Sequence, residues 1–174
     1  MHVMIDLETM GTRPNAPIIA IGAVKFTAMG LVDKEFYVNI DLESAVNDGH
    51  AVVDPKTVLW WMEQGGEARS ALRENKKKVL TALYEFRDWL KPDEPVGVWG
   101  NGASFDNVIL SETYRRMNLT PPWPFWADRC YRTVKNLYPA CTLERTGVHH
   151  NALDDAKSQA NHLLKIDTEF GPLL

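Results

Sequence analysis

The chain has 174 residues, of which 45% are hydrophobic, 24% are charged and 10% are aromatic. This composition excludes an intrinsically disordered chain, because so many aromatic residues, six of them Trp, cannot stay solvated. No run approaches the roughly eighteen consecutive apolar residues of a membrane-spanning helix. The formal net charge is −4, so the chain does not hold nucleic acid through an overall positive charge.

The chain has no internal repeat and no Gly/Ser-rich linker, and we therefore expect one domain over residues 1–174. Asp6 follows too soon after the start for the apolar region of a secretory signal to form. Cys130 and Cys141 are too few for a disulfide framework or a four-cysteine zinc site. A cytoplasmic protein that does not contact membranes is the expectation.

Three strands are predicted in the first third of the chain. Residues 3–5 form a short apolar run that ends at Asp6, and residues 17–26 form a longer run rich in β-branched side chains. Residues 34–40 alternate between polar and apolar side chains, as in a half-exposed strand. The links between these runs suit antiparallel neighbours, so we expect a three-strand meander.

Two helices are predicted in the middle of the chain. Asp54 is a suitable N-cap, Pro55 suits the first helical position, and Gly65–Gly66 end this helix. Apolar residues recur at helical spacing over residues 79–90, and Pro92 follows.

Residues 96–99 predict a central strand beyond these helices. Ser104 is expected to N-cap a helix that runs to about Asn118, and the last helix is expected to start near Asn151. Strands followed by helices in this order indicate an α/β layer architecture.

The pair Asp6 and Glu8 is the first candidate for chemistry. Residues two apart on a strand point to the same face, so the two carboxylates would repel each other unless a cation lay between them. Oxygen ligands of this kind suit Mg²⁺ or Mn²⁺. Acidic residues are also common at solvated strand ends, and the pair alone does not decide between these interpretations.

Asp106 is the second candidate. The segment from Asn101 to Asp106 leaves a strand and opens a helix, which places Asp106 in the first turn, where the helix dipole favours an anion. Phe105 can anchor this turn in the core. An ordinary N-terminal helix acid would have the same pattern.

The third candidate is His150 with Asp155. His150 lies on the loop that enters the last helix, and Asp155 lies more than one turn inside it. Asp154 is the alternative acid, but Leu153 marks the packed side of the helix, and we expect Asp154 to face solvent. His149 is expected to be exposed or structural.

Together and in this order, these groups resemble the DnaQ-like 3′→5′ exonucleases, the DEDD nucleases of the ribonuclease H-like fold. That family has an Asp-x-Glu strand, an Asn…Phe-Asp turn, and a His with an Asp five positions later. The matching residues are Asp6, Glu8, Asn101, Phe105, Asp106, His150 and Asp155. Their last pair is similar to the His-containing (DEDDh) branch, because the Tyr-containing branch would have Tyr in place of Asn151. Three residues separate Asn101 from Phe105, where many members have two.

The resemblance implies a ribonuclease H-like mixed sheet, with the antiparallel three-strand meander plus parallel strands, flanked by helices. It also implies a 3′→5′ exonuclease that hydrolyses phosphodiester bonds at single-stranded or 3′-overhang ends of RNA or DNA and releases nucleoside 5′-monophosphates. Two divalent cations, Mg²⁺ or Mn²⁺, would lie about 3.5–4 Å apart. They would formally cancel the net charge of −4 and let an acidic protein accept a polyanion.

The resemblance also assigns roles. Asp6, Glu8 and Asp155 would hold the cation that binds the attacking water. Asp6 would bridge to the second cation, and Asp106 would act on that cation directly or through water. His150 would take the proton from the water. Substrate contacts would come from Thr9, Met10 and Phe105, with Met10 as an apolar wedge and Phe105 stacking on a base.

Residues 57–64, which include Trp60 and Trp61, further resemble a subgroup of phage and mycobacterial-type exonucleases with RNA-trimming members. This favours RNA slightly, with single-stranded DNA kept open. Core packing is an equal alternative for the two Trp residues.

Weak basic clusters that could guide a nucleic-acid backbone are Arg115–Arg116 and the group Arg129, Arg132 and Lys135. A homodimer is left open.

Two alternative functions remain at this point. One is a nucleic-acid-binding module on the same fold that has lost catalysis, although a retired site has no physical reason to keep four mutually repelling acids. The other is a metal-dependent phosphodiesterase that acts on small nucleotides.

Overall fold

The computed structural model describes residues 1–91, 95–171 and 173–174. Five strands form one sheet in the order β3-β2-β1-β4-β5. The strands are β1 (His2–Thr9), β2 (Ile18–Thr27), β3 (Gly30–Asn39), β4 (Gly97–Gly100) and β5 (Asp128–Cys130). The α-helices are α1 (Leu42–Asn47), α2 (Pro55–Glu63), α3 (Gly66–Ala71), α4 (Val79–Leu90), α5 (Asp106–Arg116), α6 (Tyr131–Leu137) and α7 (Ala152–Phe170), and the 3₁₀ turn η2 (Phe125–Ala127) precedes β5.

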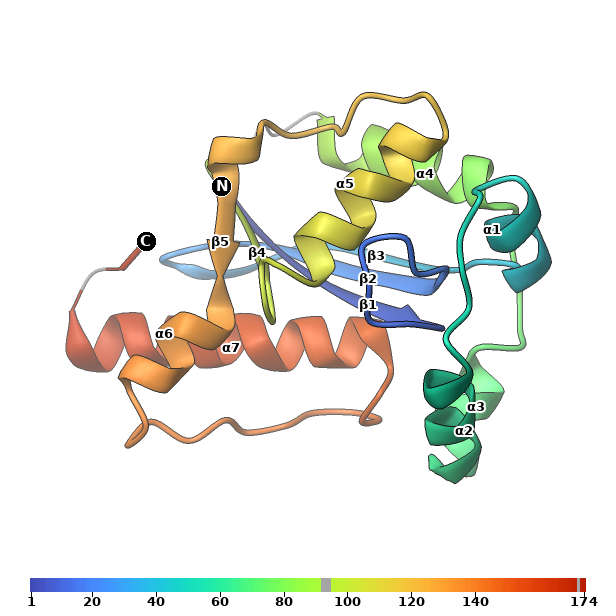
Figure 1. The fold of residues 1–174 in the computed structure, drawn as a ribbon. Coiled ribbons are helices and arrows are strands. Elements are labelled where there is room, and N and C mark those ends of the chain that lie inside the picture. Colours follow the sequence, from blue (N-terminus) through green and yellow to red (C-terminus); the bar gives the residue numbers. More distant parts are fainter. Residues whose placement is uncertain (92–94, 172) are drawn as a thin grey trace.

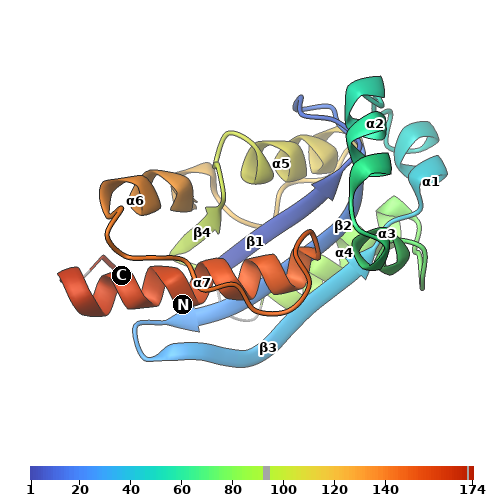
Figure 2. The ribbon, with the colours of Figure 1, turned by 90° about the horizontal axis from the view of Figure 1, so that it is seen from below.

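The sheet is mixed. β1, β2 and β3 pair antiparallel as a meander, whereas β4 pairs parallel with β1 and β5 pairs parallel with β4. Helices α4 and α5 cover one face, and α6 and α7 cover the other (Figure 1). Figure 2 shows that α7 crosses the sheet and that α2 and α3 stand beside the end of β1. The expected meander, parallel strands and flanking helices are therefore confirmed.

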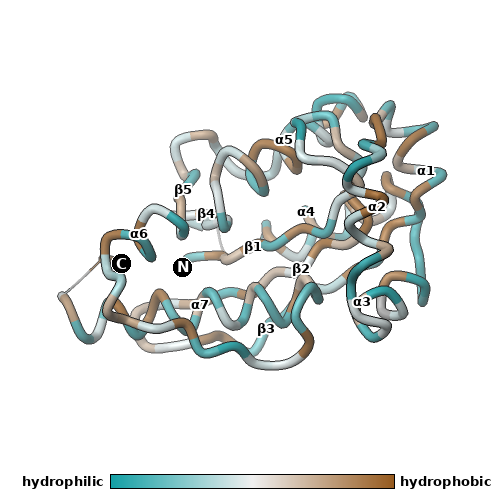
Figure 3. Tube along the Cα trace, turned by 60° about the horizontal axis from the view of Figure 1, so that its bottom comes forward, coloured by the Kyte–Doolittle hydropathy of each residue, from teal (hydrophilic) through white to brown (hydrophobic). Residues whose placement is uncertain are grey.

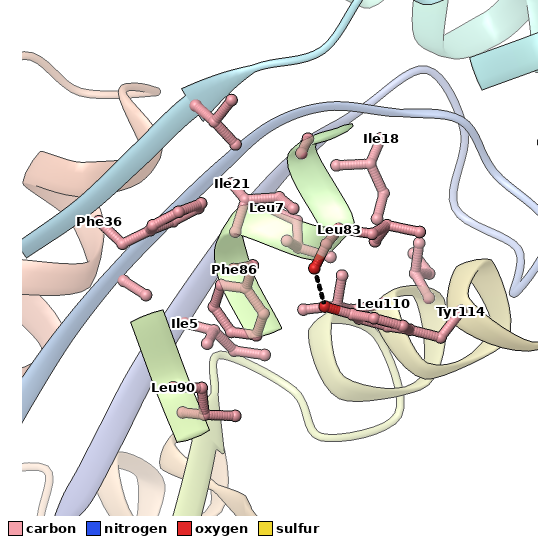
Figure 4. Packing of buried hydrophobic residues seen from close by; sticks show 14 of the residues in the cluster. Ile5, Leu7, Ile18, Ile21, Phe36, Leu83, Phe86, Leu90, Leu110 and Tyr114 are labelled. Atoms are coloured by element: carbon pink, nitrogen blue, oxygen red, sulfur yellow. Dashed lines mark hydrogen bonds between the residues drawn. The ribbon is translucent and has the colours of Figure 1, made fainter. Parts of the chain in front are cut away.

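The core consists of two layers separated by the sheet. Side chains of β1 that alternate along the strand, Ile5 and Leu7 among them, pack under α4 and α5 (Figure 4). The hydroxyl of Tyr114 donates a hydrogen bond to the carbonyl oxygen of Leu83 at 2.6 Å, which joins α5 to α4 inside this layer. In Figure 3, hydrophobic and hydrophilic residues alternate along α7, as expected of a helix with one face on the sheet.

The element bounds depart from the expected ones in places. β3 begins at Gly30 because the turn after Thr27 lets pairing with β2 start at once. Ser104 is exposed and does not cap α5, which begins at Asp106 with Phe105 in the N-cap position. Gly102, at φ 125°, forms the preceding turn and accepts the backbone N–H groups of Phe105 and Asp106.

The N-caps of two helices agree with expectation. The Asp54 side chain accepts the Lys56 N–H at 2.9 Å, and Asn151 accepts from Leu153 and Asp154 at the start of α7. Pro92 lies outside the described residues. Among the described helices, we find none that combines the length and hydrophobicity needed to cross a bilayer.

Candidate active site

The alternation of β1 places Asp6 and Glu8 on the α7 side of the sheet. Leu7, between them, packs into the opposite layer, whereas Met4 packs with α7. The Asp6 carboxylate accepts a hydrogen bond from Nε2 of Gln159 on α7 at 2.7 Å. Glu8 is only 6% exposed. Two carboxylates are thus held side by side at the end of a buried strand.

Two glycines allow helices to approach this end of the sheet. Gly22 pairs with Asp6 across the strands, and a Cβ there would lie 2.1 Å from the carbonyl carbon of Ala152. At Gly100 a Cβ would lie 2.9 Å from the Cβ of Asp106. Side chains at these positions would push α7 and α5 away, so the site depends on both glycines.

Asp106 reaches the same place from α5. Its Oδ1 accepts the backbone N–H of Leu7 at 3.2 Å, while its buried Oδ2 has no hydrogen-bond partner. The neighbouring Asn107 side chain donates to the Val98 carbonyl oxygen at 2.8 Å, which ties the start of α5 to β4. A buried carboxylate oxygen without a partner is costly and fits a site that takes up a cation.

Asp155 completes the carboxylate cluster from the first turn of α7, not from beyond that turn as expected, because the helix begins only at Ala152. One oxygen from each of Asp6, Glu8 and Asp155 can be chosen so that all three lie within 4.8 Å of one another. The expectation that Asp154 faces solvent is wrong. It is half-buried, and its carboxylate accepts the backbone N–H of Val148 at 2.8 Å, which holds the preceding loop.

His150 lies beside Asp155. Its backbone has φ 65°, and its N–H donates to Oδ2 of Asp155 at 2.9 Å. The imidazole meets the Trp60 ring edge-to-face at a centroid distance of 5.0 Å and stacks on the exposed His149 at 3.8 Å. The loop conformation and the aromatic contacts thus fix the imidazole next to the carboxylates.

The pKa values of Asp6, Glu8 and Asp106 are raised in this cluster. Burial first, and then the charges of Asp106 and Asp155, hold the pKa of Asp6 well above its usual value. Burial first, and then the charge of Asp6 followed by those of Asp155 and Asp106, raise the pKa of Glu8 to about 10, and burial raises the pKa of Asp106 to about 7. Bound divalent cations would remove this penalty, since each cation favours the ionised form of its ligands.

Burial and the cationic neighbours His149 and Arg145 lower the pKa of His150, against the opposing charge of Asp155. The imidazole is therefore favoured in its neutral form, which can accept a proton.

These groups line one cleft of about 630 Å³. Its lining also includes Thr9, Phe105 and Trp60. Met10 instead packs against the cluster of Ile19, Trp61 and Ala68 and lines a different, smaller cavity. Met10 therefore does not line the cleft described here, and the apolar wedge expected at Met10 stays a prediction.

Sequence reasoning left the place of Trp60 open and missed Gln159 and Arg145, which also line the cleft. Trp60 is 41% exposed and forms its wall, whereas Trp61 is buried and donates its Nε1–H to the Thr9 carbonyl oxygen at 2.9 Å. Gln159 could have been found, since it lies one turn after Asp155 on the same face of α7. Arg145 lies on an irregular loop, where no periodicity signals it.

The basic clusters divide between two roles. Arg116 donates to the carbonyl oxygens of Gly49 and Pro14, and Arg129 to those of Trp126 and Asp128, so both brace the fold. Arg132 lines the cleft.

Comparison with known proteins supplies the family. The model of the 3′-5′ exoribonuclease Rv2179c-like domain matches residues 1–166. The chain belongs to this family. The family is one of 3′-5′ exonucleases, as the resemblance implied. An exodeoxyribonuclease of Enterobacteria phage T4 is 29% identical over 158 aligned positions, which cover 75% of this chain and 68% of that protein.

Solved structures share the fold. The nuclease domain of 3′hExo, a DEDDh family member bound to rAMP, has a TM-score of 0.69 and 16% identity, with 99% of this chain and 94% of that domain covered. The zinc-bound complex of E. coli exonuclease I with single-stranded DNA has a TM-score of 0.70 and 12% identity, covering 97% of this chain. The present chain spans only 41% of the length of that exonuclease I chain.

Proposed function

We propose that this protein removes nucleotides one at a time from the 3′ end of single-stranded or 3′-overhang nucleic acid and releases nucleoside 5′-monophosphates. The observation that carries the proposal is the meeting of Asp6, Glu8, Asp106 and Asp155 with His150 in one cleft. Four acids from three segments, two of them with pKa values raised to about 7 and about 10, need a cation to be ionised together.

The carboxylates form an all-oxygen donor set, which suits Mg²⁺ or Mn²⁺. Asp6, Glu8 and Asp155 would hold one cation, and Asp6 with Asp106 would hold a second. When bound, two such cations would supply Lewis-acid activation of a water and stabilisation of the charge on the phosphate and the leaving 3′-oxygen. The zinc-bound exonuclease I structure is consistent with a divalent-cation site on this fold.

His150 is the general base of the proposal. Its neutral imidazole would accept the proton of the attacking water, and the adjacent Asp155 carboxylate would stabilise the imidazolium that results. Thr9, Phe105 and Trp60 line the cleft and would contact the terminal nucleotide. The Thr9 hydroxyl already donates to the Gly11 carbonyl oxygen at 2.6 Å, so Thr9 would contribute packing there. Aromatic faces accept any base by stacking, which suits a nuclease that reads ends.

RNA is our proposed preferred substrate, because the matching family is described as exoribonucleolytic. The exodeoxyribonuclease of phage T4 makes DNA the competing substrate. The distinction depends on a contact to the 2′-hydroxyl group.

The proposal is tested with 5′-labelled RNA and DNA oligonucleotides of one sequence, incubated with Mg²⁺ or Mn²⁺. We expect a ladder that shortens from the 3′ end, nucleoside 5′-monophosphates as products, and complete loss of shortening in EDTA that excess Mn²⁺ reverses. Asp6→Asn, purified in the same way, controls for contaminating nucleases and should show no ladder.

Other outcomes would select another function. Binding of the oligonucleotide without turnover in Mn²⁺ would favour the inactive binding module. Hydrolysis of a small nucleotide ester with intact oligonucleotides would favour the phosphodiesterase.

Replacement of His150 separates the base from the cations. For His150→Asn we expect kcat to fall by about 10²–10⁴-fold, which is the usual contribution of a general base, while Mn²⁺ binding is retained. His50→Asn is the matched control, because it makes the same substitution at an exposed imidazole that does not line the cleft, and its activity should stay close to wild type. Equal losses in both variants would argue against His150 as the base.

A further inference from the structure

The guanidinium group of Arg145 contacts one carboxylate of the cluster. Nη1 of Arg145 contacts Oδ1 of Asp155 at 2.5 Å. The Asp155 side chain is 10% exposed, whereas that of Arg145 is 47% exposed. Arg145 also lowers the pKa of Asp6, so its charge reaches beyond its direct partner.

The backbone that carries Arg145 is fastened to α7. The next residue, Thr146, donates its N–H to Oγ of Ser158 at 3.0 Å. Gly147 has φ 74°, and a Cβ there would lie 2.2 Å from the Asp154 carboxyl group, so the loop lies tightly on the helix. Since the backbone is held, the long and half-exposed side chain is the part that can move.

The Asp155 carboxylate cannot bind the Arg145 guanidinium and a divalent cation through the same oxygen at the same time. Its Oδ2 already accepts the His150 N–H, and Oδ1 is the oxygen that Arg145 takes. A guanidinium does not lose its proton at any ordinary pH, so it competes with the cation as a permanent charge. Binding of a cation at Asp6, Glu8 and Asp155 would therefore release Arg145.

A released Arg145 remains in the cleft, whose lining it shares with His150 and Trp60. The guanidinium has a planar fork of donors that matches a phosphate group. An overall acidic protein also needs local positive charge to receive a polyanion.

We propose that Arg145 is a substrate-binding residue that alternates between two anions. Without divalent cations it is held on Asp155, and when a cation takes its place it binds a backbone phosphate of the nucleic acid. This proposal rests on the proposed exonuclease function. It links metal loading to substrate binding, since the cleft offers its guanidinium to a phosphate only after the cation has bound.

The test measures cation binding and substrate binding separately. Mn²⁺ alone is titrated into wild type, Arg145→Ala and Lys165→Ala by calorimetry at pH 7. Lys165→Ala is the matched comparison, because it removes one positive charge from a partly exposed ion pair, with Glu144, that does not line the cleft. We expect Arg145→Ala to bind Mn²⁺ about three- to tenfold more tightly than wild type, as for loss of a partly exposed competing ion pair. Lys165→Ala should change the affinity by less than about twofold, since distant charges are screened.

The second arm measures KM with a single-stranded oligonucleotide at saturating Mn²⁺. We expect KM to rise about tenfold in Arg145→Ala, as for loss of one charge-assisted hydrogen bond, with a smaller change in kcat. If the ion pair had only a structural role, its removal would weaken Mn²⁺ binding and leave KM unchanged. Either result would overturn the proposal. Arg145→Gln, which keeps the side-chain length without the charge, carries the same test if Arg145→Ala does not fold.

The wild-type protein separates this proposal from the proposed function. If wild type neither binds Mn²⁺ nor shortens the oligonucleotide, the exonuclease proposal fails. If wild type does both and folded Arg145→Ala behaves identically, only the role of Arg145 fails.

Discussion

Glu8→Gln is expected to abolish turnover and, at the same time, to make the metal-free protein more stable. The carboxylate is buried beside Asp6, and its pKa is raised to about 10. Loss of a charged cation ligand should reduce kcat by about 10³-fold or more. The amide keeps the size of the side chain and is neutral without taking up a proton on folding, so the free energy of unfolding in EDTA at neutral pH should rise by roughly 1–3 kcal/mol.

The pH dependence of this gain has a definite sign. In the unfolded chain Glu8 releases its proton near its ordinary pKa of 4.5, whereas the folded protein retains that proton up to about pH 10. The folded state therefore binds more protons over this range, and the stability of metal-free wild type falls as pH rises above about 4.5. The advantage of Glu8→Gln should be near zero at pH 5 and largest at pH 8.

Urea unfolding in EDTA at pH 5 and pH 8 measures this difference. Glu63→Gln is the matched control, because it makes the same charge change at an exposed position and should stay within about 0.5 kcal/mol of wild type. A Glu8→Gln protein that is less stable than wild type at pH 8 would contradict the electrostatic account of the cluster.

Gly22→Ala is expected to damage both stability and activity without touching a functional side chain. Its Cβ would lie 2.1 and 2.2 Å from backbone atoms of Ala152 and Leu153, which cannot rotate away. We expect a loss of about 3 kcal/mol or more, as for severe overpacking of a core. Because α7 carries Asp155, its displacement should also reduce kcat in the folded fraction by about 10²-fold.

Gly66→Ala provides the control for this substitution. A Cβ there meets no atom within 4 Å, and the residue opens α3, so the change should be neutral or stabilising by up to about 1 kcal/mol. Thermal unfolding with activity per folded molecule measures both variants. Wild-type behaviour of Gly22→Ala would show that α7 does not need its close approach to the sheet.

Much of the fold was predictable because local signals agree with the tertiary structure. Alternation along β1 puts Asp6 and Glu8 on one face, and the Asn151 cap places the start of α7. The failure at Ser104 has a local cause: the chain turns at Gly102 with positive φ, and the backbone closes the start of α5 where a side-chain cap was expected.

The rest of the site depends on contacts between distant segments. No local sequence signal predicts the contact between the Trp60 and His150 rings, since an aromatic residue on a short helix is more often buried. Asp154 was expected to face solvent because its own helix pattern contains no information about the loop that folds over it. Arg145 meets Asp155 through that same loop.

The hydrogen bonds from the loop to Asp154 and Ser158 have a consequence for how the site responds to changes elsewhere. They fasten the segment that carries Arg145 and His150 to the first two turns of α7, the helix that also carries Asp155. A shift of α7 along the sheet would therefore move these three side chains together and keep their mutual spacing, while their distances to Asp6 and Glu8 would change.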